Sequence, residues 1–147
     1  MTSPLAEQLG PAQLTTSLLL EAVPSAAGHA RGAVTEALAR WGLHHLTEDA
    51  TAIATELVSN AVAACVEAPL PAGMPMAVSI WLNAERGELT IRAWDPDPTP
   101  PPRDYQPEPD DEHGRGLMIV NALSHRWGCT PAPGGGKYVW SRLRTDA

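Results

Sequence analysis

The sequence contains no phenylalanine, two tyrosines and five tryptophans, so leucine, valine, alanine and tryptophan must build its hydrophobic core. It is also poor in basic residues: ten Lys and Arg stand against 17 Asp and Glu, and the formal net charge is −7. A general nucleic-acid binder needs a basic face for phosphates, and no basic cluster occurs, so we expect no direct nucleic-acid binding. A length of 147 residues is enough for one globular domain with a buried core.

Cysteines are scarce as well. Cys65 and Cys129 lie far apart without CxxC or metal-ligand spacing, and Cys65 falls on an apolar helical pattern that favours a buried free thiol. The first ten residues lack a basic flank followed by an apolar run, so no signal peptide is expected. No apolar stretch approaches the roughly 20 residues that span a bilayer. We therefore expect a cytoplasmic protein that does not associate with membranes.

The periodicity of apolar residues predicts alternating helices and strands. Residues 1–14 are expected to form a flexible N-terminal lead, and residues 83–87 a hairpin connection. Residues 96–113 hold seven prolines and six acidic residues, which favours a long loop without regular structure. Helices are expected over residues 25–41, 47–67 and 116–123, and strands over 15–23, 76–82, 89–93, 127–130 and 137–143.

This order predicts an α/β (α+β) fold with a two-layer sandwich, in which a mixed, mostly antiparallel sheet carries its helices on one face. No GxGxxG motif follows an early strand and no Walker A sequence is present, which argues against the two standard phosphate-loop folds. We expect residues 15–147 to form a single domain.

Glu56 and Asn60 lie one helical turn apart, on a flank beside the apolar stripe of their helix. An amide oxygen suffices as the one protein ligand of a Mg²⁺ ion that also binds phosphates and waters, so Asn60 is a candidate metal ligand. Glu56 would then lie where a general base is needed. Alternatively, the two residues are a solvated polar pair on an amphipathic helix.

Asp95 follows Trp94 at the end of an apolar strand. A carboxylate at this place can accept a hydrogen bond from the exocyclic amine of adenine, whereas guanine would present an oxygen and be repelled. The alternative is a turn aspartate before a proline, which is common.

The Gly114-Arg115-Gly116-Leu117 segment precedes a helix. Glycines let the backbone approach phosphate oxygens, the unpaired N–H groups of a helix start face an anion, and Arg115 can add a charge-assisted contact. Residues 96–113 would form a lid over a nucleotide bound at these positions. Simple helix capping by the glycines and a disordered acidic linker are the alternatives.

In their order and spacing, the motifs at residues 56–61, 94–97 and 114–120 resemble the N, G1 and G2 boxes of the GHKL ATPase/kinase superfamily, which includes gyrase and the histidine kinases. The likeness is nearest to the small anti-sigma factor serine kinases of bacteria. It extends over about residues 15–143 and includes the Trp127-Gly128 and Gly134–Trp140 stretches.

The resemblance implies a histidine kinase-like ATPase domain with the Bergerat fold and with ATP and Mg²⁺ as cofactors. Glu56 would be the catalytic base, Asn60 the Mg²⁺ ligand and Asp95 the adenine-reading carboxylate, with Gly114 and Gly116 at the phosphates. Such proteins regulate transcription: they bind a sigma factor and phosphorylate a serine on an anti-anti-sigma (STAS) partner. Family members often dimerise, and Leu18, Leu20 and Trp41 are apolar candidates for a homodimer surface.

The sequence departs from the family pattern at several positions. Asp97 and Thr99 stand where the G1 box has glycines, and Ala63 and Ala64 where a basic residue or histidine is frequent. Tyr138 stands where a threonine often supports the adenine site. Negative charge at the end of the acidic loop is unfavourable near phosphates unless it points outward or meets Mg²⁺. Two functions are therefore expected: a protein serine/threonine kinase, or a sequestering module, with or without nucleotide, that performs no phosphotransfer.

Overall fold

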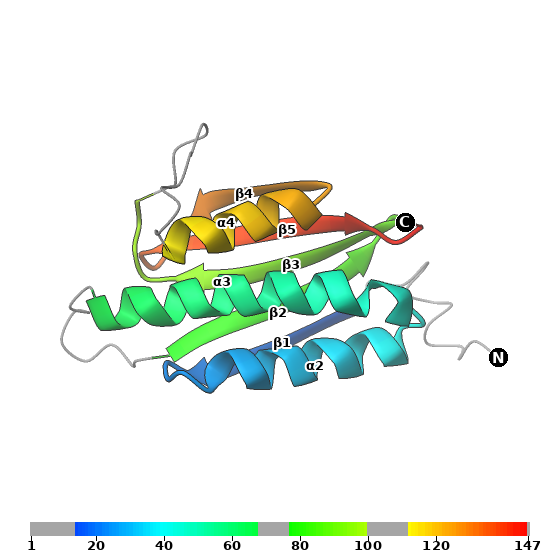
Figure 1. Ribbon diagram of the computed structural model, residues 1–147, viewed down its shortest axis with the longest axis horizontal. Coiled ribbons are helices and arrows are strands. Elements are labelled where there is room, and N and C mark those ends of the chain that lie inside the picture. Colours follow the sequence, from blue (N-terminus) through cyan, green and yellow to red (C-terminus); the bar gives the residue numbers. More distant parts are fainter. Residues whose placement is uncertain (1–13, 68–76, 100–111, 147) are drawn as a thin grey trace.

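The computed structural model describes residues 14–67, 77–99 and 112–146, without the side chains of residues 112–116. Figure 1 shows the elements, and the helices and strands expected from the sequence are all present with shifted ends. In chain order they are β1 (Leu14–Glu21), α2 (Ala26–Arg40), the 3-10 turn η1 (His44–Leu46), α3 (Thr47–Glu67), β2 (Ala77–Glu85), β3 (Glu88–Asp95), α4 (Glu112–Leu123), β4 (Arg126–Pro131) and β5 (Lys137–Arg144).

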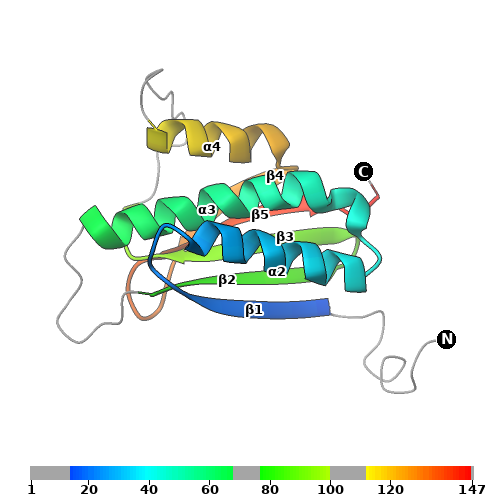
Figure 2. The same ribbon diagram turned by 60° about the horizontal axis from the view of Figure 1, so that its bottom comes forward.

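The five strands form one sheet in the order β1-β2-β3-β5-β4, and α2, α3 and α4 all lie on one side of it (Figures 1 and 2). The two-layer sandwich expected from the sequence is confirmed. Every neighbouring pair of described strands is antiparallel, so this part of the chain contains no parallel pairing of the kind a mixed sheet would include. None of the described helices has the length and apolar character needed to cross a membrane.

The hydrophobic core lies between the sheet and the helices. The strands alternate, so every second side chain faces the helices and is buried, as the period of two in the sequence requires. α2 and α3 contribute alanines at positions where the helices pack against each other and the sheet, which lets their backbones approach closely. The largest fully buried side chains include Leu38, Ile53, Leu89, Ile91 and Val34.

Strand β1 shows that one expectation about the surface is wrong. Leu20 is buried and Leu18 is partly buried against the core, whereas Leu19 between them is 74% exposed. Because alternate strand residues face opposite sides of a sheet, Leu18 and Leu20 contribute to the core, not to a homodimer surface. Trp41 is likewise packed against the core.

Two connections differ from the sequence-based expectation. Residues 83–85 continue β2, and the hairpin closes through Arg86 and Gly87 alone, both with positive φ, because a two-residue turn of that hand matches the twist of the strands. Helix α4 begins at Glu112, four residues earlier than expected. Acidic residues are favoured at the first turn of a helix, so the acidic end of the 96–113 segment starts a helix where irregular structure was expected.

Candidate functional site

The carboxylate of Asp95 is the centre of the candidate site. It ends β3, is only 7% exposed, and accepts a hydrogen bond of 2.9 Å at Oδ1 from the backbone N–H of Asp97. The carboxylate of Asp97 repeats this arrangement, accepting a 3.0 Å bond from the N–H of Thr99. Asp97 and Thr99 thus follow Asp95 as two successive side-chain-stabilised turns, so this segment holds its shape without the glycines that the resemblance led us to expect.

Lys137 is a residue of the candidate site to which the sequence interpretation gave no role. It pairs with Asp95 in the strand register, and its Nζ lies 3.7 Å from Asp95 Oδ1 and donates a 2.6 Å bond to the backbone oxygen of Asp97. Lys137 is also 7% exposed, and it is the single lysine in the sequence. This contact could have been predicted from the sequence. Lys137 begins the last strand, and if that strand pairs antiparallel with β3, its first residue lies beside the last residue of β3.

Tyr138, the residue expected to stand near the adenine site, lies on the other face of the sheet. There its ring contacts Trp81, with centroids 5.3 Å apart, and the guanidinium of Arg92, 4.2 Å away. Strand alternation explains this outcome, because neighbouring residues cannot face the same side. The candidate site therefore receives a positive charge from Lys137 where a threonine hydroxyl was considered.

Burial raises the pKa of Asp95 above its ordinary value, and this effect outweighs the Asp97 N–H and the Lys137 ammonium, both of which lower it. The carboxylate is thus only partly compensated by its protein neighbours. A hydrogen-bond donor on a bound molecule would stabilise the ionised form. This is the electrostatic character needed to recognise an amine.

The glycine-rich turn before β5 packs tightly against the end of β3. Gly136 has φ +72°, and a Cβ there would clash with the backbone oxygen of Asp95 and crowd the indole of Trp94. The indole Nε1 of Trp94 also donates a 3.0 Å bond to the backbone oxygen of Gly135. The turn therefore fixes the end of β3 and depends on glycine at position 136.

Helix α3 supplies the polar flank predicted from the sequence. Glu56 and Asn60 are both partly buried, and within the described part of the chain neither side chain has a hydrogen-bond partner. Burial raises the pKa of Glu56, and a raised pKa would suit a carboxylate that accepts a proton. Farther along the helix, burial and, to a smaller extent, the charge of Asp95 raise the pKa of the Cys65 thiol.

The Gly114–Gly116 segment lies inside the first turns of α4, not before them, so its backbone forms part of the helix start. The side chain of Arg115 lies outside the described residues, as do residues 100–111 of the expected lid. Leu117 is partly buried. Arg115 and the lid remain predictions.

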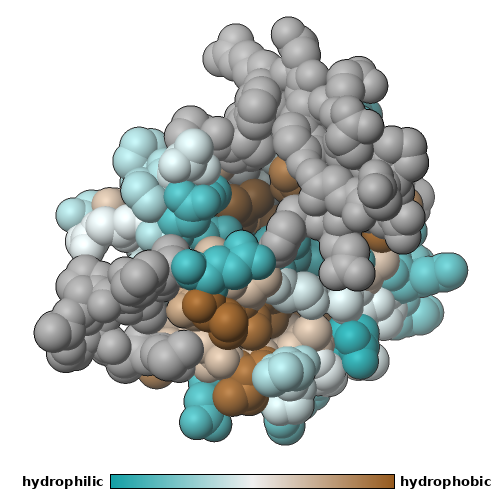
Figure 3. Space-filling model, turned by 60° about the vertical axis from the view of Figure 1, so that its left-hand side comes forward, coloured by the Kyte–Doolittle hydropathy of each residue, from teal (hydrophilic) through white to brown (hydrophobic). Residues whose placement is uncertain are grey.

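The ends of β3 and α3 and the beginning of α4 lie at one end of the molecule, on the left in Figure 1. Figure 3 looks at this end and shows apolar residues, in brown, beside strongly polar ones in teal. No group of three or more His, Cys, Asp or Glu in residues 14–67, 77–99 and 112–146 could hold a metal ion by itself. A divalent cation would fit only as a shared ion, bound by the unpartnered Asn60 amide and by oxygens of a phosphorylated ligand.

Comparison with known proteins identifies the family of this chain. The profile of the family described as histidine kinase-like ATPase domain matches residues 20–140. Among curated proteins none matches the chain. The crystal structure of the RsbU and RsbW domains of Rv1364c from Mycobacterium tuberculosis is similar over 88% of this chain, with a TM-score of 0.62 and 21% sequence identity. The match covers 32% of that chain, and at this identity it shows a shared fold.

Proposed function

This chain belongs to the histidine kinase-like ATPase domain family, and we propose that it binds ATP with Mg²⁺ at the end of the sheet formed by Asp95 and Lys137. Two observations support the proposal: Glu56 and Asn60 on α3 are partly buried without a hydrogen-bond partner in the described part of the chain, and the buried carboxylate of Asp95 is only partly compensated.

Each residue has a defined task in this proposal. The Asp95 carboxylate accepts a hydrogen bond from the base amine, and the Lys137 ammonium holds that carboxylate in place. The Asn60 amide oxygen would hold the Mg²⁺ that accompanies the phosphates, and this ion would supply positive charge beside them. The unpaired N–H groups of the first turn of α4, which contains Gly114, would face the phosphates, whereas the N–H of Gly116 lies one turn inside the helix.

We further propose that the protein is an anti-sigma-type serine kinase, cytoplasmic and without direct contact to nucleic acid. Its partners would be a sigma factor and an anti-anti-sigma (STAS) protein. Glu56, with its raised pKa, would accept the proton of the partner's serine hydroxyl as that oxygen attacks the γ-phosphorus and ADP leaves. The RsbU and RsbW domains named for the similar structure support the choice of a regulatory partner system.

The test is transfer of labelled γ-phosphate from Mg·ATP to a STAS-type partner. Glu56→Gln should abolish transfer while leaving the ATP dissociation constant within about threefold, because it removes the base and keeps the shape. Ser59→Ala is the matched control, since Ser59 is exposed on the same helix. Transfer that survives Glu56→Gln would exclude Glu56 as the base.

A sequestering module without phosphotransfer is the second candidate. It is favoured by the Asp95–Lys137 pair, because the carboxylate proposed to read the base already has a cationic neighbour. Calorimetric titration with Mg·ATP, combined with the phosphate-transfer assay, separates the two candidates. Binding without transfer supports the nucleotide-bound module, and no heat up to millimolar ATP supports sequestration without nucleotide.

A further inference from the structure

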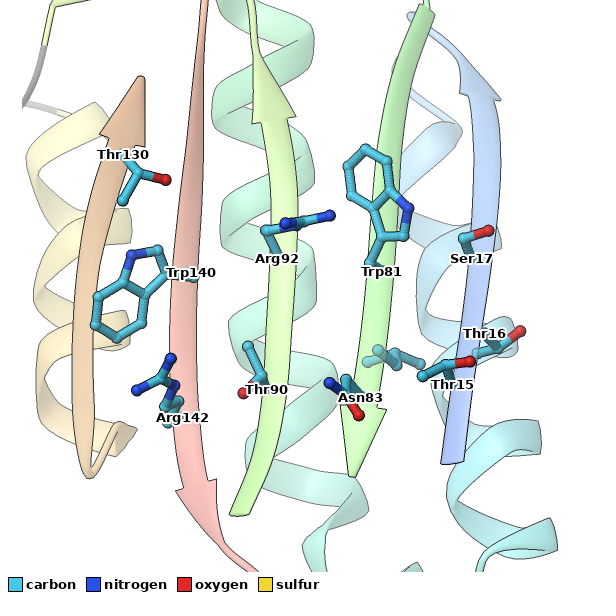
Figure 4. A pocket seen from close by; sticks show the side chains of 11 residues that line it. Thr15, Thr16, Ser17, Trp81, Asn83, Thr90, Arg92, Thr130, Trp140 and Arg142 are labelled. Carbon is cyan, nitrogen blue, oxygen red and sulfur yellow. The ribbon is translucent and has the colours of Figure 1, made fainter. Parts of the chain in front are cut away.

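The face of the sheet opposite the helices carries a groove with a cavity volume of about 630 Å³ (Figure 4). Its lining comes from all five strands, so the groove crosses the whole sheet. Within the described part of the chain, no helix covers this face. Of the described lining residues, Leu82 belongs to the hydrophobic core, and none belongs to the proposed nucleotide site.

Two rows of side chains form the floor of the groove. In the first row, strand register places Trp140 beside Arg92 and Arg92 beside Trp81. The second row lies two residues along each strand and contains Arg142 and Asn83, with Thr90 between them. Figure 4 shows both rows from the open side. The first row thus has an arginine between two tryptophans, and the second row has an arginine and two neutral polar side chains.

Both arginines are held by aromatic rings. The guanidinium of Arg92 lies 4.5 Å from the ring centre of Trp81 and 4.2 Å from that of Tyr138, and Arg142 lies 4.8 Å from Trp140. The ring of Trp140 packs directly over Gly128 on β4, where a Cβ would be too close. Stacking uses the flat face of a guanidinium and leaves its N–H edges free for an acceptor.

The groove is a positive site on a negative protein. The described residues that line it include no carboxylate, although the chain carries a net charge of −7. Arg92 and Arg142 form no ion pair within the described part of the chain, whereas the nearby Arg126 pairs with Glu88 at 3.3 Å. The amide oxygen of Asn83 is buried without a hydrogen-bond partner, so an N–H donor is also missing here.

We propose that this groove binds an extended acidic peptide segment of a protein partner. Carboxylates of the peptide receive hydrogen bonds from the edges of Arg92 and Arg142, its apolar atoms pack on Trp81 and Trp140, and a backbone N–H donates to Asn83. Charge complementarity between an uncompensated pair of arginines and a carboxylate-bearing segment carries the assignment.

Size and charge favour a peptide over the other polyanions. Five strands at about 4.8 Å spacing make a groove roughly 19 Å long, the length of about six extended residues. Two arginines match two or three carboxylates. They are too few for the row of phosphates on a nucleic-acid strand, which the surrounding negative charge of the protein would also repel.

The test uses fluorescein-labelled hexaglutamate as the probe, with hexaglutamine and a thymidine hexanucleotide for comparison, and measures fluorescence anisotropy with the full chain. Hexaglutamate should bind and the other two should not. Arg92→Gln and Arg142→Gln should each weaken binding about tenfold, because each removes one charged hydrogen-bond donor. Arg31→Gln, which removes the same charge from α2 on the opposite layer, should leave binding unchanged.

Thr130→Glu is an independent test of the proposal, because it adds a carboxylate at the edge of the groove and leaves both stacked arginines in place. It should abolish binding of hexaglutamate even if the arginine variants fail to fold. The proposal is overturned if the parent protein does not bind hexaglutamate or if the hexanucleotide binds better. It is also overturned if Arg31→Gln weakens binding as much as Arg92→Gln, because the attraction would then be unspecific.

Discussion

Replacing Lys137 by methionine removes the cation beside Asp95 and keeps a side chain of similar length. In the folded protein Asp95 then keeps only the Asp97 N–H as a stabilising neighbour, while it stays 7% exposed. Breaking a buried ion pair by removing one partner costs about 3–5 kcal/mol. The distance of 3.7 Å and the remaining hydrogen bond place the expected loss near the lower limit, about 3 kcal/mol at neutral pH.

The pH dependence of this loss has a definite sign. Burial already raises the pKa of Asp95 above the unfolded value of 3.8, and Lys137 lowers it, so Lys137→Met raises the folded pKa further. A carboxyl with a raised folded pKa favours the folded state when it is protonated, and this stability is lost as pH rises through the folded pKa. The variant's deficit relative to the parent should therefore be largest at neutral pH and shrink as the solution is acidified toward pH 3.8.

Urea denaturation of the parent, Lys137→Met, Asp95→Asn and the double variant over this pH range measures both effects. The double variant should lose less unfolding free energy than the sum of the two single losses, by about 2 kcal/mol, because it removes both members of the pair. Arg126→Met is the matched control. Its ion pair with Glu88 is shorter, 3.3 Å, but its arginine is 52% exposed, so we expect a loss below about 1 kcal/mol without this pH dependence. A loss for Lys137→Met no larger than for Arg126→Met would refute the idea that burial, not distance, sets the strength of these pairs.

Three further outcomes follow from the same structure. Asp95→Asn should weaken ATP binding at least about tenfold in calorimetric titration, because an amide is a poorer acceptor for the base amine than a carboxylate; equal affinities would remove Asp95 from the site. Gly136→Ala should lower the free energy of unfolding by about 2 kcal/mol or more, since φ is +72° and the added Cβ meets the end of β3, while Gly134→Ala, with open space around it, should change it by less than about 1 kcal/mol. Ile91→Ala, at a fully buried position of β3, should cost about 2–5 kcal/mol in urea denaturation, and a loss below that range would mean that the core collapses around the missing atoms.

The periodicity of apolar residues was sufficient to predict the fold, because buried residues recur at a regular spacing along each helix and strand. In the folded protein, the alternating apolar residues of β2 and β3 and the apolar stripe of α3 are buried, as the sequence predicts. Burial of these residues forms the two layers. Boundaries were less predictable. Glu112 begins a helix although it lies at the end of a proline-rich, acidic stretch of sequence, and composition averages over such a boundary.

The candidate site was predictable where its residues belong to one element. Glu56 and Asn60 share a flank of α3 by helical geometry alone. The Asp95–Lys137 contact joins residues 42 positions apart and needs the strand order, in which β3 pairs with β5. The resemblance related Tyr138 to the family's adenine site and gave no role to the adjacent Lys137, and in a strand one residue changes the face of the sheet.

The single lysine of this chain also has a chemical consequence. An amine-reactive reagent has two kinds of target on the protein, the N-terminal amine and Lys137, and the latter is almost fully buried. Acylation of Lys137 therefore requires that the pairing of β3 with β5 open locally, so its rate reports the population of that open form. Mass spectrometry of one peptide over time would follow the opening of this end of the sheet, with no engineered label. A molecule bound against Asp95 would slow the reaction in proportion to its occupancy.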